Sequence, residues 1–164
     1  MGLLSPIIQH NPERKLIGVS VSMTLSEPKT AALWQHWMPR RQEIVNALSN
    51  DFISMSLYPA DYFDAFHPHL VFEQWAAVEV SDFQHVPEGM KTFVLPAGRY
   101  AVFHYKGPAG DASIFQAIFT QWLPASDFVL DHRPHFEVLG EKFHRHRPDS
   151  EEEIWIPVRP KIQP

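Results

Sequence analysis

One order of elements, strand–helix–strand–strand, recurs in the two halves of the 164-residue sequence. Alternating apolar and polar residues predict the strands, and apolar residues on one helical face predict the helices. In the first half, strands are predicted over 15–23, 53–58 and 72–80, with a helix over 29–48 after the first of them. Pro39 removes a backbone donor inside this helix, so we expect a kink or a break near Trp37 and Met38.

The second half repeats the order after a short lead-in. The lead-in is 91–95, the strands are predicted over 99–106, 128–131, 136–139 and 154–159, and a helix runs from about 114 to 123. Asp111 or Ser113 is available as the N-cap of that helix, and Pro124 closes it. The segments 72–78 and 152–158 correspond, and this correspondence aligns Trp75 with Trp155. Recurrence of one element order along a chain is typical of a duplication.

A duplication of this kind predicts an α+β fold. We expect a single domain over 1–164, made of tandem β-α-β-β units at about 13–85 and 90–160. The units should be related by a pseudo-twofold axis, with antiparallel sheets and two helices around a central cleft. A groove on such an axis receives equivalent residues from both halves.

Composition restricts the classes of function. The sequence has no cysteine, which excludes disulfides and Cys-ligated zinc. A formal net charge of -5 argues against direct nucleic-acid binding, which depends on a basic face. Neither a signal peptide nor a membrane span is predicted, so we expect a cytoplasmic protein. Six of the ten histidines occur in three close pairs beside Pro and Arg, at 67/69, 132/135 and 144/146, and we predict neither a metal site nor a cofactor.

The second half carries a set of motifs in a characteristic order. They are LPAGRYAVFHYKG at 95–107, WLP at 122–124, PHFE at 134–137 and IWIPV at 154–158. With these motifs the chain resembles the GyrI-like family, also known as the AraC-type regulator effector-binding domain, over about 13–160. The resemblance implies a tandem β-α-β-β fold with a ligand-binding cleft, as in multidrug-sensing domains, a gyrase inhibitor and hydrolases of cyclopropane-containing genotoxins.

The chain departs from the regulators of that family in two respects. No helix-turn-helix is found in the sequence, so direct control of transcription is not expected. The glutamate motif usually ends in tyrosine two residues later, where this chain has Leu139. Tyr105 is the candidate to supply the missing wall of the cleft.

Glu137 is the leading candidate for a functional residue. It lies in a strand between apolar neighbours, where a carboxylate is costly to bury without a partner, and a bound cation is one such partner. Aromatic rings around it would form a cage for a cation. The predicted ligand-binding residues are Glu137, Trp75, Trp155, Tyr58, Tyr105, Phe66, Phe136 and Trp37. Strand alternation allows only one of His104 and Tyr105 into the cleft, and we favour Tyr105.

Three functions are compatible with these residues. The first is binding of an apolar, aromatic or cationic small molecule in an aromatic cleft with one acidic residue. The second is hydrolysis of a strained electrophile, in which Glu137 acts on water as a general base. The third is interaction with a protein partner through an exposed apolar patch, without any ligand.

Overall fold

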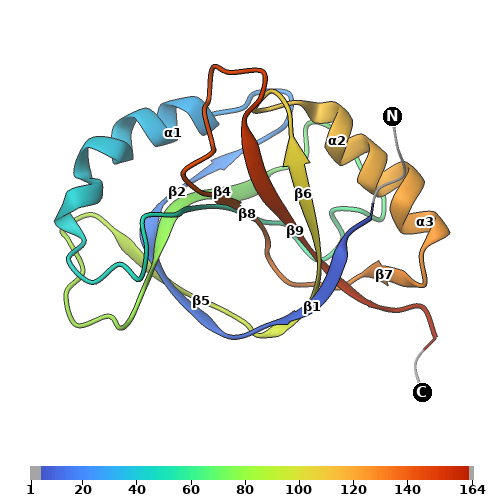
Figure 1. Ribbon diagram of the computed structural model, residues 1–164, viewed down its shortest axis with the longest axis horizontal. Helices are drawn as coiled ribbons and strands as arrows, with labels where there is room; N and C mark the ends of the chain where they lie inside the picture. Colours follow the sequence, from blue (N-terminus) through green and yellow to red (C-terminus); the bar gives the residue numbers. More distant parts are fainter. Residues whose placement is uncertain (1–4, 163–164) are drawn as a thin grey trace.

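The computed structural model describes residues 5–162 as an α+β fold with one large antiparallel sheet (Figure 1). The strands are β1 (Ile7–Asn11), β2 (Arg14–Met23), β3 (Phe52–Leu57), β4 (Phe72–Val80), β5 (Lys91–Leu95), β6 (Gly98–Lys106), β7 (Phe128–Leu130), β8 (His135–Leu139) and β9 (Glu151–Pro160). The helices are α1 (Thr30–Trp37), the 3₁₀ segment Met38–Glu43, α2 (Ala112–Ala117), the π-helical segment Ile118–Trp122 and α3 (Leu123–Ala125).

The sheet confirms the duplication and corrects one expectation. Its strand order is β1-β6-β9-β8-β3-β4-β2-β5, and β7 pairs with β9. The unit β2-α1-β3-β4 therefore has the same arrangement as the unit β6-α2-β8-β9. We expected a separate small sheet in each unit, but β3 pairs with β8, with Met55 opposite Phe136, and this joins the units into one sheet. Edge strands with unpaired backbone groups pair readily, which is the physical reason for the fusion.

The two lead-in strands cross between the halves. The strand β1 precedes the first unit but pairs with β6 of the second, and β5 precedes the second unit but pairs with β2 of the first. The strand β1 was missed in the sequence because Ile7 and Ile8 are consecutive apolar residues at an exposed edge, without alternation. This exchange ties each half to the other.

The helices cover one face of the sheet. Helix α1 packs Leu33, Trp34 and Trp37 on β2 and β4, and Ile114 and Ile118 of the second helical segment pack on β6 and β9. Figure 1 shows α1 and the α2–α3 segment well apart from each other. The expected break in the first helix is confirmed, because α1 ends at Trp37 and Pro39 lies in the 3₁₀ segment. No helix of residues 5–162 is long and apolar enough to cross a membrane.

The other face of the sheet holds a core that the two halves share. A row of register partners, Trp75–Met55–Phe136–Trp155, runs across the junction of β3 and β8. Met55 is fully buried in its centre. The register makes Trp75 the counterpart of Trp155, as the sequence correspondence predicted, and it also makes Met55 the counterpart of Phe136.

Candidate functional site

A small cavity lies on the helix-covered face, where β3 and β8 meet. Its volume is about 40 Å³, and its lining residues are Ser54, Ser56, Tyr58, Phe115, Phe119, His135, Phe136, Glu137, Ile154, Trp155 and Ile156. The floor comes from the strands β3, β8 and β9, and Phe115 and Phe119 come from the helical segment of the second unit. The cavity is therefore on the predicted pseudo-twofold axis, with most of its wall from the second half.

Glu137 is the acidic group of the cavity. It lies opposite Ser54 on β3 and Ile154 on β9, and it is half-buried. Burial raises the pKa of Glu137 well above its ordinary value near 4.5, and contact with the Glu152 carboxyl raises that pKa further. Within residues 5–162, the ion pairs of the structure include neither Glu137 nor Glu152. Both effects favour the protonated form of Glu137.

Glu152 is a second carboxyl group next to Glu137, although it lines the wider depression at the end of β8 and not the small cavity. It precedes Ile154 by two residues on β9, so its side chain is on the same face as that of Glu137 and is its diagonal neighbour. Glu152 is 8% exposed, and its Oε2 atom accepts no hydrogen bond. The neighbouring Glu152 carboxyl therefore disfavours the ionised form of Glu137.

A group of rings covers the cavity. The Phe63 ring stacks on His135 with centroids 5.5 Å apart and on Phe119 at 5.5 Å, and Tyr58 packs edge-on to His135 at 4.9 Å. Burial lowers the pKa of His135 to about 3 and raises that of Tyr58. Both side chains are therefore neutral at pH 7. Phe63 belongs to the loop between β3 and β4, and the contacts of its ring attach this loop to the second half.

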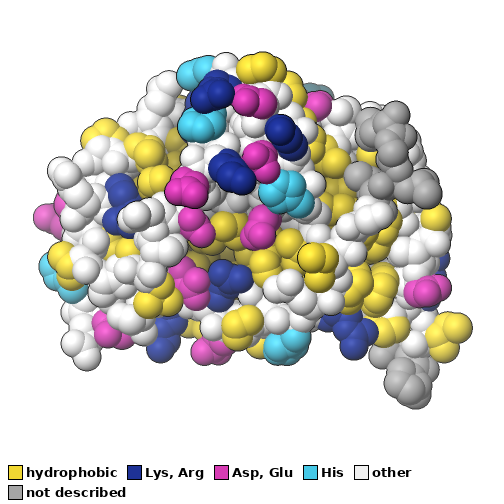
Figure 2. Space-filling model, viewed as in Figure 1, with side chains coloured by type: hydrophobic (Ala, Val, Ile, Leu, Met, Phe, Trp, Pro, Cys, Tyr) yellow, Lys and Arg dark blue, Asp and Glu magenta, His cyan; other side chains and the backbone are white. Residues whose placement is uncertain are grey.

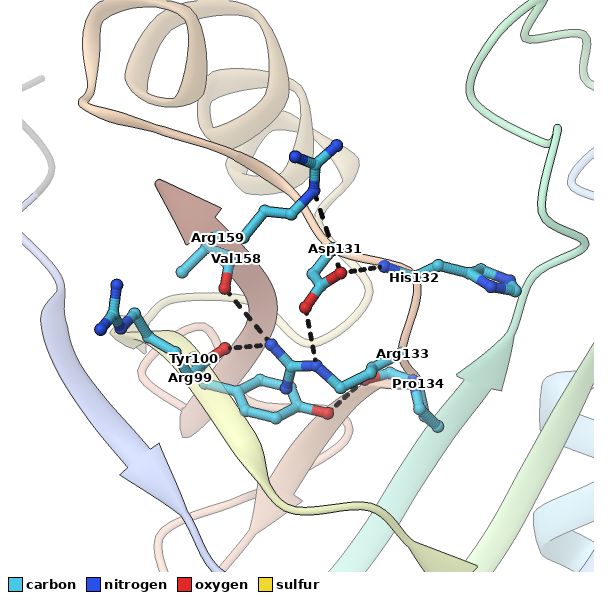
Figure 3. Close-up of polar contacts among 8 residues, drawn as sticks. All are labelled: Arg99, Tyr100, Asp131, His132, Arg133, Pro134, Val158 and Arg159. Atoms are coloured by element: carbon cyan, nitrogen blue, oxygen red, sulfur yellow. Dashed lines mark hydrogen bonds and ion pairs between the residues drawn. The ribbon is translucent and has the colours of Figure 1, made fainter. Parts of the chain in front are cut away.

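The turn before β8 is fixed by one arginine (Figure 3). Arg133 donates hydrogen bonds to Asp131, 3.1 Å, and to the carbonyl oxygens of Arg99, 2.7 Å, and Val158, 3.3 Å. Its guanidinium group also lies 4.8 Å from the centre of the Tyr100 ring. These contacts attach the turn to β6 and β9 immediately before His135 and Glu137, and so they set the position of both side chains.

A wider depression opens at the end of β8. Its volume is about 610 Å³, and its lining residues are Asn50, Asp51, Phe52, His104, Val138, Gly140, Glu141, Lys142, Glu151, Glu152 and Glu153. Figure 2 shows acidic and basic side chains gathered over this part of the molecule, around β6, β8, β9 and the loop 140–150. In residues 5–162 no three His, Asp or Glu side chains converge as a metal site.

A match to the model of a protein family shows which family the chain belongs to. The model of the family described as "Cass2: Integron-associated effector binding protein" matches residues 7–158. The chain belongs to this family. It is thus an effector-binding protein with the GyrI-like fold, as the sequence motifs indicated.

Individual proteins agree with the family. The transcriptional regulator BrlR of Pseudomonas aeruginosa is 29% identical over 153 residues, which are 92% of this chain and 54% of BrlR, so the chain spans about half the length of that curated relative. SAV2435, solved with bound tetraphenylphosphonium, is similar with a TM-score of 0.70 and 15% identity over 95% of this chain and 94% of that one. An integron cassette protein of Vibrio cholerae has a TM-score of 0.65 and 16% identity, over 93% and 95% of the two chains.

Two of the predicted site residues of this Cass2-family chain reach the cavity with their side chains. Glu137 and Tyr58 lie together in its wall. Phe136 and Trp155 border the cavity, but their rings stack on each other in the core of the opposite face, with centroids 5.0 Å apart. Trp75 belongs to that same core. The predicted clamp of Trp75 and Trp155 around Glu137 is therefore not formed, because strand alternation directs these rings to the opposite face.

The cation-binding faces of both tryptophans are already occupied. The Arg14 guanidinium lies 5.1 Å from the Trp155 ring centre, and the Lys91 ammonium lies 5.1 Å from that of Trp75. In both halves, a cationic side chain of the protein itself therefore lies against the equivalent tryptophan ring.

The remaining predicted residues lie outside the cavity. Trp37, the last residue of α1, is fully buried against the sheet, and Phe66 is 53% exposed in the loop after β3. Tyr105 is on the same face as Glu152, but its hydroxyl donates to Asp111, 3.0 Å, at the start of α2. The ring beside Glu137 is therefore that of Tyr58, and the prediction that Tyr105 replaces the missing tyrosine wall does not agree with the structure.

Sequence reasoning missed several side chains of the site. They are Ser54, Ser56, Phe115, Phe119, His135 and Glu152. Two signals were available: Phe115 and Phe119 have helical spacing, and His135 precedes Glu137 by two residues, which places both on one strand face. Glu152 gave no signal, since it belongs to a run of three glutamates that is typical of a solvated loop.

Proposed function

We propose that the cavity at the β3–β8 junction binds an organic cation with an apolar or aromatic body, and that Glu137 is its counter-ion. The observation that carries the proposal is a half-buried carboxyl group that faces a ring-lined cavity and has no basic partner among residues 5–162. A buried carboxylate is costly unless it is paired, and a cation in the cavity supplies the pair.

The size of the cavity indicates how the ligand enters. A volume of about 40 Å³ accommodates a small headgroup, whereas sites for drug-sized ligands measure ~300–1,000 Å³. The body of the ligand must therefore displace rings. Phe63 is the best placed to move, because it is 37% exposed and belongs to a loop. The tetraphenylphosphonium bound to SAV2435 is a cation of this class and supports the proposal. Hydrolysis and binding of a protein partner remain alternatives.

Titration with tetraphenylphosphonium tests the proposal. We expect binding to quench tryptophan fluorescence, and we expect Glu137→Gln to weaken the affinity by at least tenfold, because the amide keeps the shape of the carboxyl but carries no charge. The affinity is measured by fluorescence titration and by calorimetry.

Glu27→Gln is the matched control, because Glu27 is exposed and the same charge is removed. It should bind like the wild type. Equal affinity of Glu137→Gln and wild type, or an equal loss in both variants, would contradict the proposal.

A further inference from the structure

A second carboxyl group lies beside the cavity, in the wall of the wider depression, and this changes the class of ligand that the site can select. Glu137 and Glu152 are diagonal neighbours on β8 and β9, and the Glu152 carboxyl raises the pKa of Glu137. Glu152 is more than nine-tenths buried, and its Oε2 atom has no donor. An unsatisfied buried acceptor of this kind costs free energy, which a ligand with a donor group can recover.

We propose that Glu152 is a specificity-determining residue, and that the ligand is a protonated amine whose N–H group bridges the carboxyl groups of Glu137 and Glu152. The inference depends on the proposed cation site and extends it from cations in general to cations that donate hydrogen bonds. A quaternary cation neutralises charge equally well but cannot donate to Glu152. A hydrogen bond between an ammonium group and a carboxylate is among the strong ones in proteins.

Binding of the ammonium ion can be balanced in charge by the release of a proton. Without ligand, the raised pKa of Glu137 favours the protonated form of its carboxyl group. When an ammonium group enters, that proton leaves to solvent, and the charge of the bound cation takes the place of the charge of the proton. One proton is thus released for each ammonium ion bound, while the cavity keeps its charge.

The surrounding groups do not interfere with this exchange. On β8 itself, His135 has a pKa lowered to about 3 by burial, so it remains neutral. Tyr58, after β3, and Tyr105, on β6, both have a pKa raised mainly by burial and also remain neutral. The helical segment above the site contributes Phe115 and Phe119, which do not titrate.

A pair of matched probes tests the inference. Benzyldimethylammonium and benzyltrimethylammonium differ by one N–H that is replaced by N–CH₃. We expect the wild type to bind the first at least tenfold more tightly, and Glu152→Gln to reduce this ratio below threefold. Glu153→Gln is the control, since it is adjacent on β9 but faces the opposite side, and it should keep the wild-type ratio.

Calorimetry of the wild type in two buffers with different ionisation enthalpies gives a second measurement that needs no variant. We expect close to one proton to be released per benzyldimethylammonium ion bound at neutral pH. Equal affinities of the wild type for both probes, an unchanged ratio in Glu152→Gln, or no proton release would overturn the inference. If these results are obtained but tetraphenylphosphonium still binds in a Glu137-dependent manner, the proposed cation site stands and only the proposed role of Glu152 fails. If no cation binds, both proposals fail.

Discussion

At the scale of residues, burial shifts the pKa values of Glu137 and His135 so that the neutral form of each side chain is favoured. The two shifts have opposite effects on the way in which stability depends on pH. The pKa of Glu137 is raised above 4.5, mainly by burial, so its contribution to stability is complete below pH 4.5 and is lost as the pH rises. The pKa of His135 falls from 6.5 to about 3, so its contribution is present above pH 6.5 and is lost as the pH falls. A carboxyl group that destabilises the fold at neutral pH is what a binding site, rather than a packing position, is expected to retain.

Glu137→Gln should therefore stabilise the protein at high pH. We expect its free energy of unfolding to exceed that of the wild type at pH 8, with the difference shrinking towards pH 4.5, because the raised pKa of Glu137 makes its ionisation costly in the folded state. Urea unfolding at several pH values measures it. Glu27→Gln should follow the wild type throughout, and a Glu137→Gln curve parallel to that of the wild type would show that the carboxyl is not held protonated.

At the scale of elements, short connections position the site more than the strands do. The π-helical segment Ile118–Trp122 contains Phe119 and follows Phe115 in the second helix, and such segments are frequent at functional sites. The turn before β8 is held by Arg133, whose side chain is 13% exposed. The Tyr100 hydroxyl adds a hydrogen bond of 2.7 Å to the carbonyl oxygen of Pro134. The cavity is therefore sensitive to a residue that does not line it.

Arg133→Ala should destabilise the fold by about 3 kcal/mol, because hydrogen bonds from a charged donor to two backbone carbonyls and Asp131 are lost inside a mostly buried turn. Chemical denaturation measures the loss. Arg159→Ala is the comparison. Arg159 is 50% exposed and its ion pair with Asp131 is long, at 4.0 Å, so this substitution should cost less than about 1 kcal/mol. Similar losses in the two variants would mean that the turn is not held by Arg133.

At the scale of the whole molecule, the two halves are one folding unit. The lead-in strands cross between them, and the core row from Trp75 to Trp155 passes through Met55 at the junction. Neither half can bury its face of the sheet alone. The expectation that the protein does not bind nucleic acid directly depends only on the net charge of -5 and remains a prediction.

Met55→Ala should lower the stability of both halves together. We expect a loss of about 3 kcal/mol in a single transition, because a fully buried methionine is removed from the shared core. Tryptophan fluorescence and far-UV circular dichroism should report the same midpoint. Met38→Ala, at an exposed position, should change the stability by less than about 0.5 kcal/mol. Two separate transitions would show that the halves unfold independently.

The sequence by itself determined the α+β duplication, most strand positions, the break at Pro39 and the family resemblance. It also selected Glu137 as the leading candidate for a functional residue. Periodicity and proline chemistry act locally, so they can be read from neighbouring residues. Only the tertiary structure decided that β3 and β8 fuse the sheets, that Trp75 and Trp155 face away from Glu137, and that Glu152 contacts it. Strand register and the face of each side chain depend on pairing between distant segments, and a shift of one residue exchanges the two faces.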